Sequence, residues 1–168
     1  MKNVLPSCIL AKLIESLVFS HLRYCIQVYG NASNCHLQKI QKVVHFAARV
    51  MSGRRKFDRI SDVTRSLGWL SARDFVDLND ICLIHRILSQ KQPLSVASQF
   101  KRNHQVASRR TRQSNLLTVP QVRTRHGQRT FQCRVAKLYN AAVIAKNRQD
   151  LSVRRLKAVL KREFMSRR

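Results

Sequence analysis

The sequence predicts a mainly α-helical chain: a small helical bundle followed by an irregular basic segment and two amphipathic helices. Three observations support this fold class. Apolar residues recur at helical spacing over several stretches of the first hundred residues, the spacing disappears between 101 and 128, and it returns from Phe131 onward. A chain of 168 residues with 44% hydrophobic residues is long enough for one core, or one core and a tail. We therefore expect a helical unit at 1–100, a basic extended linker at 101–128 and basic helices at 129–168.

Two helices are expected near the N-terminus. Apolar residues spaced three or four apart predict one amphipathic helix over 7–29, because Pro6 suits a helix start and Gly30 suits a helix end. A second helix is expected through 37–51, with Gly53 at its end, and its apolar side should pack on the first helix. The apolar band of the first helix is wider than one neighbouring helix can cover.

The clearest helix prediction begins after Ser71. Ser71 followed three residues later by Asp74 is typical of a capping box, and apolar residues continue at helical spacing from Phe75 to Leu88. Carboxylates near a helix N-terminus interact favourably with the helix dipole. We therefore interpret the early carboxylates as a solvated helix start; they are Asp74, Asp77 and Asp80.

The remaining segments carry shorter patterns. Residues 67–70 are predicted to form a turn that places Trp69, the only tryptophan, in the core. Between 101 and 128 the chain is polar, rich in arginine and interrupted by Pro120 and Gly127, which predicts extended backbone with a short hairpin at 116–122. Helical spacing returns at 131–142 and at 153–164, and both late helices are expected to have basic outer faces.

The charge of the chain predicts a polyanionic partner. The sequence holds 33 Lys and Arg against 8 Asp and Glu, a net charge of +25 that no folding argument requires. Residues 101–168 contribute 19 of the cations and two of the carboxylates, and no carboxylate lies between Asp80 and Asp150. These cations have no counter-ion nearby in sequence. Nucleic acid is the first candidate partner and an anionic membrane the second.

Six arginines of the basic segment are predicted to contact phosphates. Guanidinium groups bind phosphate with two parallel hydrogen bonds, and neighbouring Thr and Gln side chains add neutral donors. The alternative for this segment is a solvated basic linker. Aromatic residues are few there, so base stacking is not indicated. The candidate residues are Arg109, Arg110, Arg112, Arg123, Arg125 and Arg129.

Catalytic chemistry is not expected of this chain. Nucleotidyl transfer by two metal ions needs neighbouring carboxylates, typically Asp-Asp or Asp-x-Asp, and neither pair occurs. The series of aspartates from Asp74 to Asp80 is the nearest substitute, but a solvated helix start explains it better. No nucleophile with a matching base and no glycine-rich phosphate loop is found. We therefore expect no enzymatic activity and no cofactor.

A metal site built from cysteine and histidine is conceivable but not favoured. His21 and Cys25 are four residues apart, and Cys35 and His36 follow. Because Cys25 continues an apolar stripe, a buried thiol without metal is the preferred interpretation. The five cysteines form no CxxC pair, which favours a reduced intracellular location, nuclear or cytoplasmic, and not secretion.

An ordered set of short segments resembles one protein family. Residues 5–6 and 16–30 are similar to an "LP…SLV.PHL.YC..VWG" pattern, and residues 37–42 and 67–73 to "L…QK.QNRA.R" and "LGWLP…R". Residues 111–140 resemble "TR…L..P..RT..G.R.F…A.LWN.LP". Together they resemble the region after the palm in jockey-like reverse transcriptases of LINE-type, non-LTR retrotransposons.

The resemblance implies a thumb-like helical part at 1–100 and a C-terminal extension, with the catalytic aspartates upstream of this chain. It implies a template-primer grip within an RNA-directed DNA polymerase, with RNA or DNA and the rest of the reverse transcriptase as partners. Tyr29 and Tyr139 stand where the family usually has Trp, and the Leu-Pro after Asn140 is missing, so we expect a truncated or degenerate copy. One alternative function is a structural module that docks on the polymerase palm, with charge serving solubility. A weaker alternative is a basic amphipathic element that binds anionic membrane.

Overall fold

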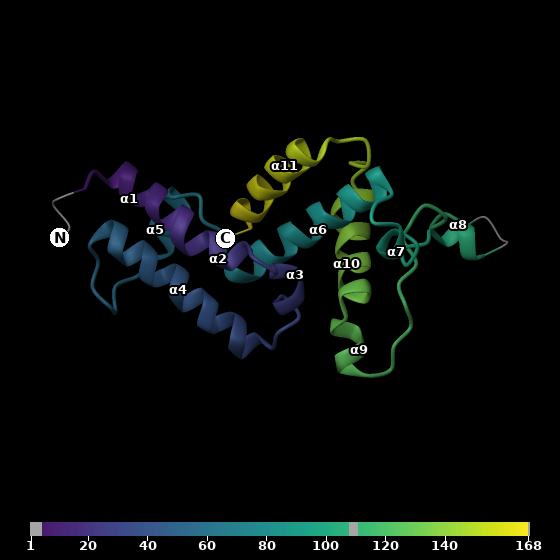
Figure 1. Ribbon diagram of the computed structural model, residues 1–168, viewed down its shortest axis with the longest axis horizontal. Coiled ribbons are helices and arrows are strands. Elements are labelled where there is room, and N and C mark those ends of the chain that lie inside the picture. Colours follow the sequence, from purple (N-terminus) through teal and green to yellow (C-terminus); the bar gives the residue numbers. More distant parts are fainter. Residues whose placement is uncertain (1–4, 108–110, 168) are drawn as a thin grey trace. The chain divides into compact units, whose positions relative to one another are not determined.

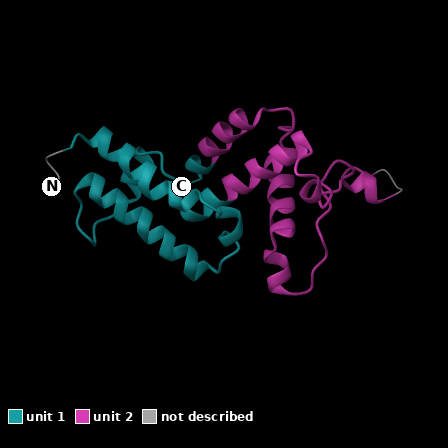
Figure 2. Ribbon diagram, viewed as in Figure 1, with its two compact units in different colours: residues 1–76, 164–168 teal, residues 77–163 magenta. Residues whose placement is uncertain are grey.

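The computed structural model describes residues 5–107 and 111–167 and is mainly helical, which confirms the predicted fold class (Figure 1). The chain divides into two compact units, residues 1–76 with 164–168 (unit 1) and residues 77–163 (unit 2) (Figure 2). The division falls inside helix α6, Ala72–Gln90. The domain boundaries expected at residues 100 and 128 come from apolar spacing and charge along the sequence. The division by spatial contacts does not test them, so they stay a prediction.

The first helical stretch of unit 1 is interrupted, so the prediction of one helix over 7–29 is wrong. Helix α1, Ser7–Ile14, continues through a π-helical turn, Glu15–Phe19, into α2, Ser20–Arg23. The chain then leaves the helix before α3, Ile26–Tyr29, because Cys25 adopts a left-handed conformation with φ of 50°. The hydroxyl of Tyr29 donates to the carbonyl of Leu22 across this break. Apolar spacing continues through the break, so the pattern of residues does not mark it.

The second helix packs on the first as the sequence predicts. Helix α4, Asn34–Ser52, ends at Gly53, whose backbone has φ of 75° and whose N–H donates to the carbonyl of Arg49. Only glycine adopts this left-handed conformation without steric cost, which explains its place after a helix. The buried residues of this core come from α1, the π-helical turn, α4 and the residues on either side of α5, Ser61–Ser66. They include Ile14, Phe19, Val44, Ala48 and Trp69.

Two further predictions for unit 1 are confirmed. Trp69 is buried, and its ring meets the ring of Phe19 edge-on with centroids 4.9 Å apart. The turn that delivers it contains Gly68 with φ of 66°. Helix α6 begins after Ser71, whose hydroxyl accepts from the N–H of Asp74 at 3.1 Å and donates to its carboxylate at 2.6 Å. The Ser71 side chain therefore satisfies a backbone donor of the first turn.

Unit 2 contains the first of the two late helices that the sequence predicts and most of the second, whose residues 164–166 belong to unit 1. Helix α10, Phe131–Tyr139, continues into a π-helical turn, Asn140–Ile144, and α11 spans Val153–Ser166. Shorter helices precede them: α7, Leu94–Ala97; α8, Asn103–Val106; and α9, Arg125–Arg129. Fully buried apolar side chains of this unit include Ile81, Ile84, Val135, Val143, Leu156 and Leu160.

The hairpin expected at 116–122 does not form. Instead, an isolated antiparallel bridge joins Leu117 to Arg102, fifteen residues earlier in the chain. The N–H of Asn103 donates to the carbonyl of Leu116, and the N–H of Thr118 donates to the carbonyl of Lys101, both at 2.9 Å. The backbone groups of the segment are therefore satisfied by a distant partner, and a local turn is not needed.

Candidate nucleic-acid interface

The basic segment of unit 2 is anchored to the helices by Asn140. The Nδ2 group of Asn140 donates to the carbonyl of Leu117 and its Oδ1 accepts from the N–H of Leu117, each at 2.9 Å. The Leu117 side chain is buried, with 2% of its surface exposed. The side-chain amide thus takes the place of a neighbouring strand. The segment that carries the candidate arginines is thus fixed at Leu117, between Arg112 and Arg123.

The C-terminal end of the segment is fixed by the short helix α9. The hydroxyl of Thr124 accepts from the N–H of Gly127 at 3.1 Å, and the hydroxyl of Thr130 donates to the carbonyl of Gly127 at 2.7 Å. A Cβ atom at Gly127 would lie 2.9 Å from the Cβ of Val122. The helix therefore folds back on the preceding chain at a distance that only glycine allows.

The structure places four of the six candidate arginines, all with exposed side chains. None of these four side chains forms a hydrogen bond or ion pair with a residue in the described part of the chain. They are Arg112, Arg123, Arg125 and Arg129. The other two, Arg109 and Arg110, lie outside the described residues.

The four described arginines form two groups. Arg112 is beside the stretch that is hydrogen-bonded to α8, because the backbone carbonyls of Gln113 and Ser114 accept from Asn103 and His104 at 3.0 Å. Arg123 precedes α9, and Arg125 and Arg129 belong to it. These last two are four residues apart, so they project from the same side of the helix. The charge is arranged along the segment and not gathered at one point.

Asp80 corrects two predictions at once. Its side chain is fully buried, and its Oδ2 atom accepts from Nε of Arg134 at 3.0 Å and lies 2.7 Å from Nη2. Asp80 is therefore not part of a solvated helix start. Arg134 is itself buried, which leaves Lys137 as the exposed cation of α10, so the predicted basic outer face of this helix is wrong.

A second carboxylate of unit 2 also binds cations that lack acidic neighbours in sequence. Glu163 forms ion pairs with Lys146 and with Arg148, the latter at 2.8 Å. From the sequence, the cations between Asp80 and Asp150 have no counter-ion nearby in the chain. For Lys146 and Arg148, as for Arg134, the fold supplies one from a distant position.

Helix α11 carries a further basic surface that the sequence identified only in general terms. Its buried side includes Leu156 and Leu160, and cations cover the outer side. The exposed cations are Arg154, Arg155, Lys157, Lys161 and Arg162. These side chains were not among the candidate site residues, because amphipathic spacing alone does not separate a solvated face from a binding face.

The cysteine interpretation is also corrected. Cys25 is exposed, not buried, because the chain breaks the helix at this residue and turns the side chain out of the apolar stripe. In the described ranges, no three side chains of His, Cys, Asp or Glu lie close enough together to hold a metal ion.

Two observations bear on the class of protein. Among the helices within residues 5–107 and 111–167, none is long and apolar enough to cross a membrane. Comparison of the chain with protein-family models, with curated proteins and with solved structures gives no match.

Proposed function

We propose that the chain binds nucleic acid through the phosphate backbone, using the exposed arginines of residues 112–129, a segment anchored at Leu117 and at α9. One observation carries the proposal: Arg112, Arg123, Arg125 and Arg129 are exposed and have no counter-ion among the described residues. Residues 77–163 hold 19 Lys and Arg against four Asp and Glu, and two of those carboxylates already bind other cations. An external polyanion would neutralise the excess.

The anchoring of the segment supports binding by reducing its entropic cost. A basic chain without fixed points loses conformational freedom when it binds, and this loss lowers affinity. Here the bonds from Asn140 to Leu117 and from Thr124 to Gly127 hold the backbone on both sides of Arg123. The arginine side chains are exposed, which suits contacts with a regular phosphate backbone without reading base sequence.

The chain is, in this proposal, the non-catalytic region after the palm of an RNA-directed DNA polymerase from a jockey-like, non-LTR retrotransposon. The assignment is supported by the set of segments that resemble this family in order along the chain. It is also supported by the structural roles of two residues in those segments. Trp69 is a core residue of unit 1, and Asn140 anchors the basic segment. In a full-length parent the region would grip the template and primer in the nucleus or cytoplasm, and by itself it would catalyse nothing.

A second candidate function is docking on another part of a polymerase, with charge serving solubility. Apolar side chains exposed on unit 1 favour it. Leu13 and Leu17 are 39% and 63% exposed on the first helical stretch, and Phe46 is 67% exposed on α4. Such side chains are more often covered by a partner than left in water when they lie together.

A mobility-shift titration of the full chain separates the two functions. Binding to a duplex and to single strands of DNA and RNA would be measured over a series of salt concentrations. Phosphate binding predicts that the logarithm of affinity falls linearly with the logarithm of salt, by about 0.9 per contact on duplex DNA. Absence of binding at low salt would exclude the proposal and leave docking. Primer extension by the purified chain would contradict the non-catalytic assignment.

A further inference from the structure

The loop between α4 and α5 is a second basic surface, and it carries an exposed aromatic side chain. Phe57 is 92% exposed, the highest value among the large apolar side chains of the described residues. Its neighbours Arg55, Lys56 and Arg59 are also exposed. Residues 49–65 hold six Lys and Arg against two Asp. Cations therefore surround the ring, and no apolar neighbour in the loop covers it.

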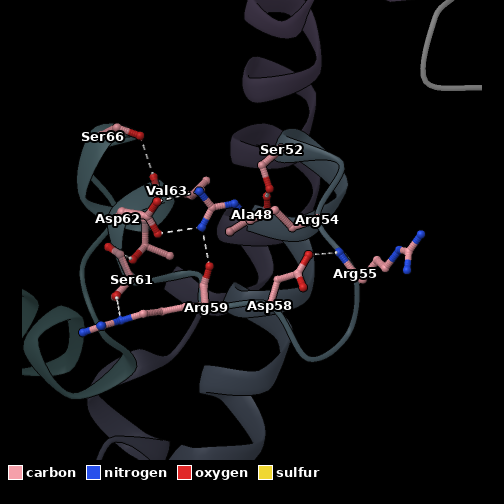
Figure 3. Close-up of polar contacts among 11 residues, drawn as sticks. Ala48, Ser52, Arg54, Arg55, Asp58, Arg59, Ser61, Asp62, Val63 and Ser66 are labelled. Atoms are coloured by element: carbon pink, nitrogen blue, oxygen red, sulfur yellow. Dashed lines mark hydrogen bonds and ion pairs between the residues drawn. The ribbon is translucent and has the colours of Figure 1, made fainter.

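The acidic residues of the loop are used to fix its shape. The Asp58 carboxylate accepts from the backbone N–H of Arg55 at 2.7 Å and closes the turn that presents Phe57 (Figure 3). The Arg54 guanidinium binds both carboxylate oxygens of Asp62 at 2.7 and 2.6 Å and also donates to the carbonyl of Arg59. In Figure 3 the Arg55 side chain points away from this cluster.

This internal pairing has an electrostatic consequence. The hydrogen bond from Arg54 is the main cause that lowers the pKa of the Asp62 carboxyl. Asp62 is therefore ionised at neutral pH and is occupied by Arg54. Among the described residues, the side chains of Arg55, Lys56 and Arg59 next to Phe57 form no ion pair with a carboxylate.

A cleft of unit 1 continues from the loop. Its volume is about 1140 Å³, and Asp58 and Arg59, which directly follow Phe57, belong to its wall. Three more arginines line the cleft, together with the polar side chains of Gln41 and His45. Of these arginines, Arg54 is bound to Asp62, which leaves Arg49 and Arg65 to supply positive charge beside Arg59. The phosphates of a nucleic-acid strand that continues from Phe57 into the cleft would lie near these cations.

We propose that this loop binds an unpaired nucleotide of a single strand. The base stacks on Phe57, and the flanking phosphates contact Arg55, Lys56 and Arg59. Every base has a flat face, so stacking on an aromatic side chain tolerates any sequence, and basic side chains follow the backbone. The Lys56 ammonium lies 5.6 Å from the ring centroid of Phe57, and the large exposure of the ring leaves surface for a base. The proposal rests on the proposed function, because it names the form of nucleic acid that unit 1 would take.

A single strand explains the loop better than a membrane or a protein surface does. Membrane insertion uses several neighbouring apolar side chains, whereas the loop presents one ring among cations. Apolar docking surfaces have few charges at their centre. A partner that is anionic and also offers a flat apolar face satisfies both features of the loop.

The test compares variants of the full chain on single-stranded and duplex oligonucleotides of equal length at one salt concentration. Phe57→Ala should weaken single-strand binding about fivefold or more, the lower limit for loss of one stacked base, and should change duplex binding less than twofold. Phe57→Tyr keeps the ring and should bind as the parent does. Phe46→Ala removes another exposed ring of unit 1 and is the matched control. Circular dichroism checks that each variant keeps its helices.

A second measurement follows the stack directly. Emission of the tryptophan introduced by Phe57→Trp should be quenched by a single strand and not by a duplex, over the background of buried Trp69. If Phe57→Ala loses affinity for the single strand and the duplex equally, or loses affinity for neither, the inference is wrong. Phosphate binding by the arginines of the anchored segment would not be affected by that result. If Phe57→Ala loses binding to phosphatidylserine vesicles but keeps its binding to oligonucleotides, the loop binds a membrane and the inference is also wrong. If the unmodified chain binds neither oligonucleotide, the proposed function itself fails.

Discussion

Asn140 and Leu117 are joined by two hydrogen bonds: the side-chain Nδ2 of Asn140 donates to the backbone carbonyl of Leu117, and the N–H of Leu117 donates to Oδ1 of Asn140. Leu117 also forms the antiparallel bridge with Arg102, so its backbone is held from two sides. The two bonds connect the basic segment to the π-helical turn that follows α10. A side chain thus supplies the hydrogen-bond partners that a strand would supply in a sheet.

Asn140→Ala is predicted to destabilise unit 2 by about 1–3 kcal/mol, because the substitution leaves a buried donor and a buried acceptor of Leu117 unpaired. Urea denaturation followed by circular dichroism measures the change. Asn115→Ala is the matched control, since Asn115 is exposed in the same segment, and it should unfold as the parent does. Equal unfolding midpoints for the two variants would show that the pairing of Asn140 with Leu117 adds nothing to stability.

The buried ion pair of Asp80 and Arg134 gives a second prediction. Removing one member of a buried pair leaves an uncompensated charge and costs about 3–5 kcal/mol, whereas replacing both by apolar residues of similar size costs much less. Asp80→Leu and Arg134→Met should each destabilise strongly. The double variant should be more stable than the sum of the two losses predicts. Additive losses in denaturation experiments would contradict the direct coupling of these side chains.

Most helices of the fold could be predicted from sequence, because their information is local. Apolar spacing predicted α4 and α11, a glycine marked the end of α4, and Ser71 with Asp74 marked the start of α6. The break at Cys25 could not be predicted, because a left-handed conformation at a non-glycine residue has no sequence pattern. The bridge between Arg102 and Leu117 was missed for a related reason, since its two partners are distant in the chain.

The candidate site could be predicted only in part. Charge counting selected the arginines between 109 and 129, but it treated Arg134 and Arg148 as cations without counter-ions until the fold paired them with Asp80 and Glu163. The net charge of residues 1–100 is much smaller than that of residues 101–168, so a comparison of charge between these regions does not single out the basic loop around Phe57. The residues Arg-Arg-Lys-Phe directly after a helix-ending glycine were the available signal. Exposure of the Phe57 ring is a property of the folded chain and not of the sequence pattern.

Tyr139 gives a prediction about pH. Its hydroxyl lies 3.0 Å from Nδ1 of His85, whose Nε2 lies 2.7 Å from the carbonyl of Leu151. A carbonyl only accepts, so Nε2 carries a proton, and in the neutral imidazole Nδ1 accepts from the tyrosine hydroxyl. Burial raises the pKa of Tyr139 from the ordinary value of 10.0 to about 12. The hydroxyl is therefore held in its neutral form beyond the pH at which an unfolded chain would ionise.

Stability should consequently fall as pH rises from about 10 to about 12. In this window the unfolded chain has released the tyrosine proton and the folded chain still binds it, so alkaline pH favours unfolding. Below this window the contribution of Tyr139 is fully present. Tyr139→Phe should be less stable than the parent at neutral pH and should lose less stability on the alkaline side. Thermal melts across the window test this, with exposed Tyr24→Phe as control. An unchanged alkaline loss in Tyr139→Phe would assign the effect to other groups.

The last prediction concerns where the chain contacts phosphate. Changing Arg112, Arg123 and Arg125 to Gln should weaken binding to all duplex sequences alike and lower the log-log salt slope by about three, since each lost phosphate contact removes about 0.9. Changing the same three arginines to Lys should preserve most of the slope, because the slope depends on charge. The matched control changes three exposed cations of unit 1, Lys12, Lys39 and Lys42, to Gln. Both triple variants remove the same net charge, so a general effect of charge on binding would lower affinity and slope equally. The anchored segment is the site only if the arginine variant loses clearly more affinity and more slope than the lysine control.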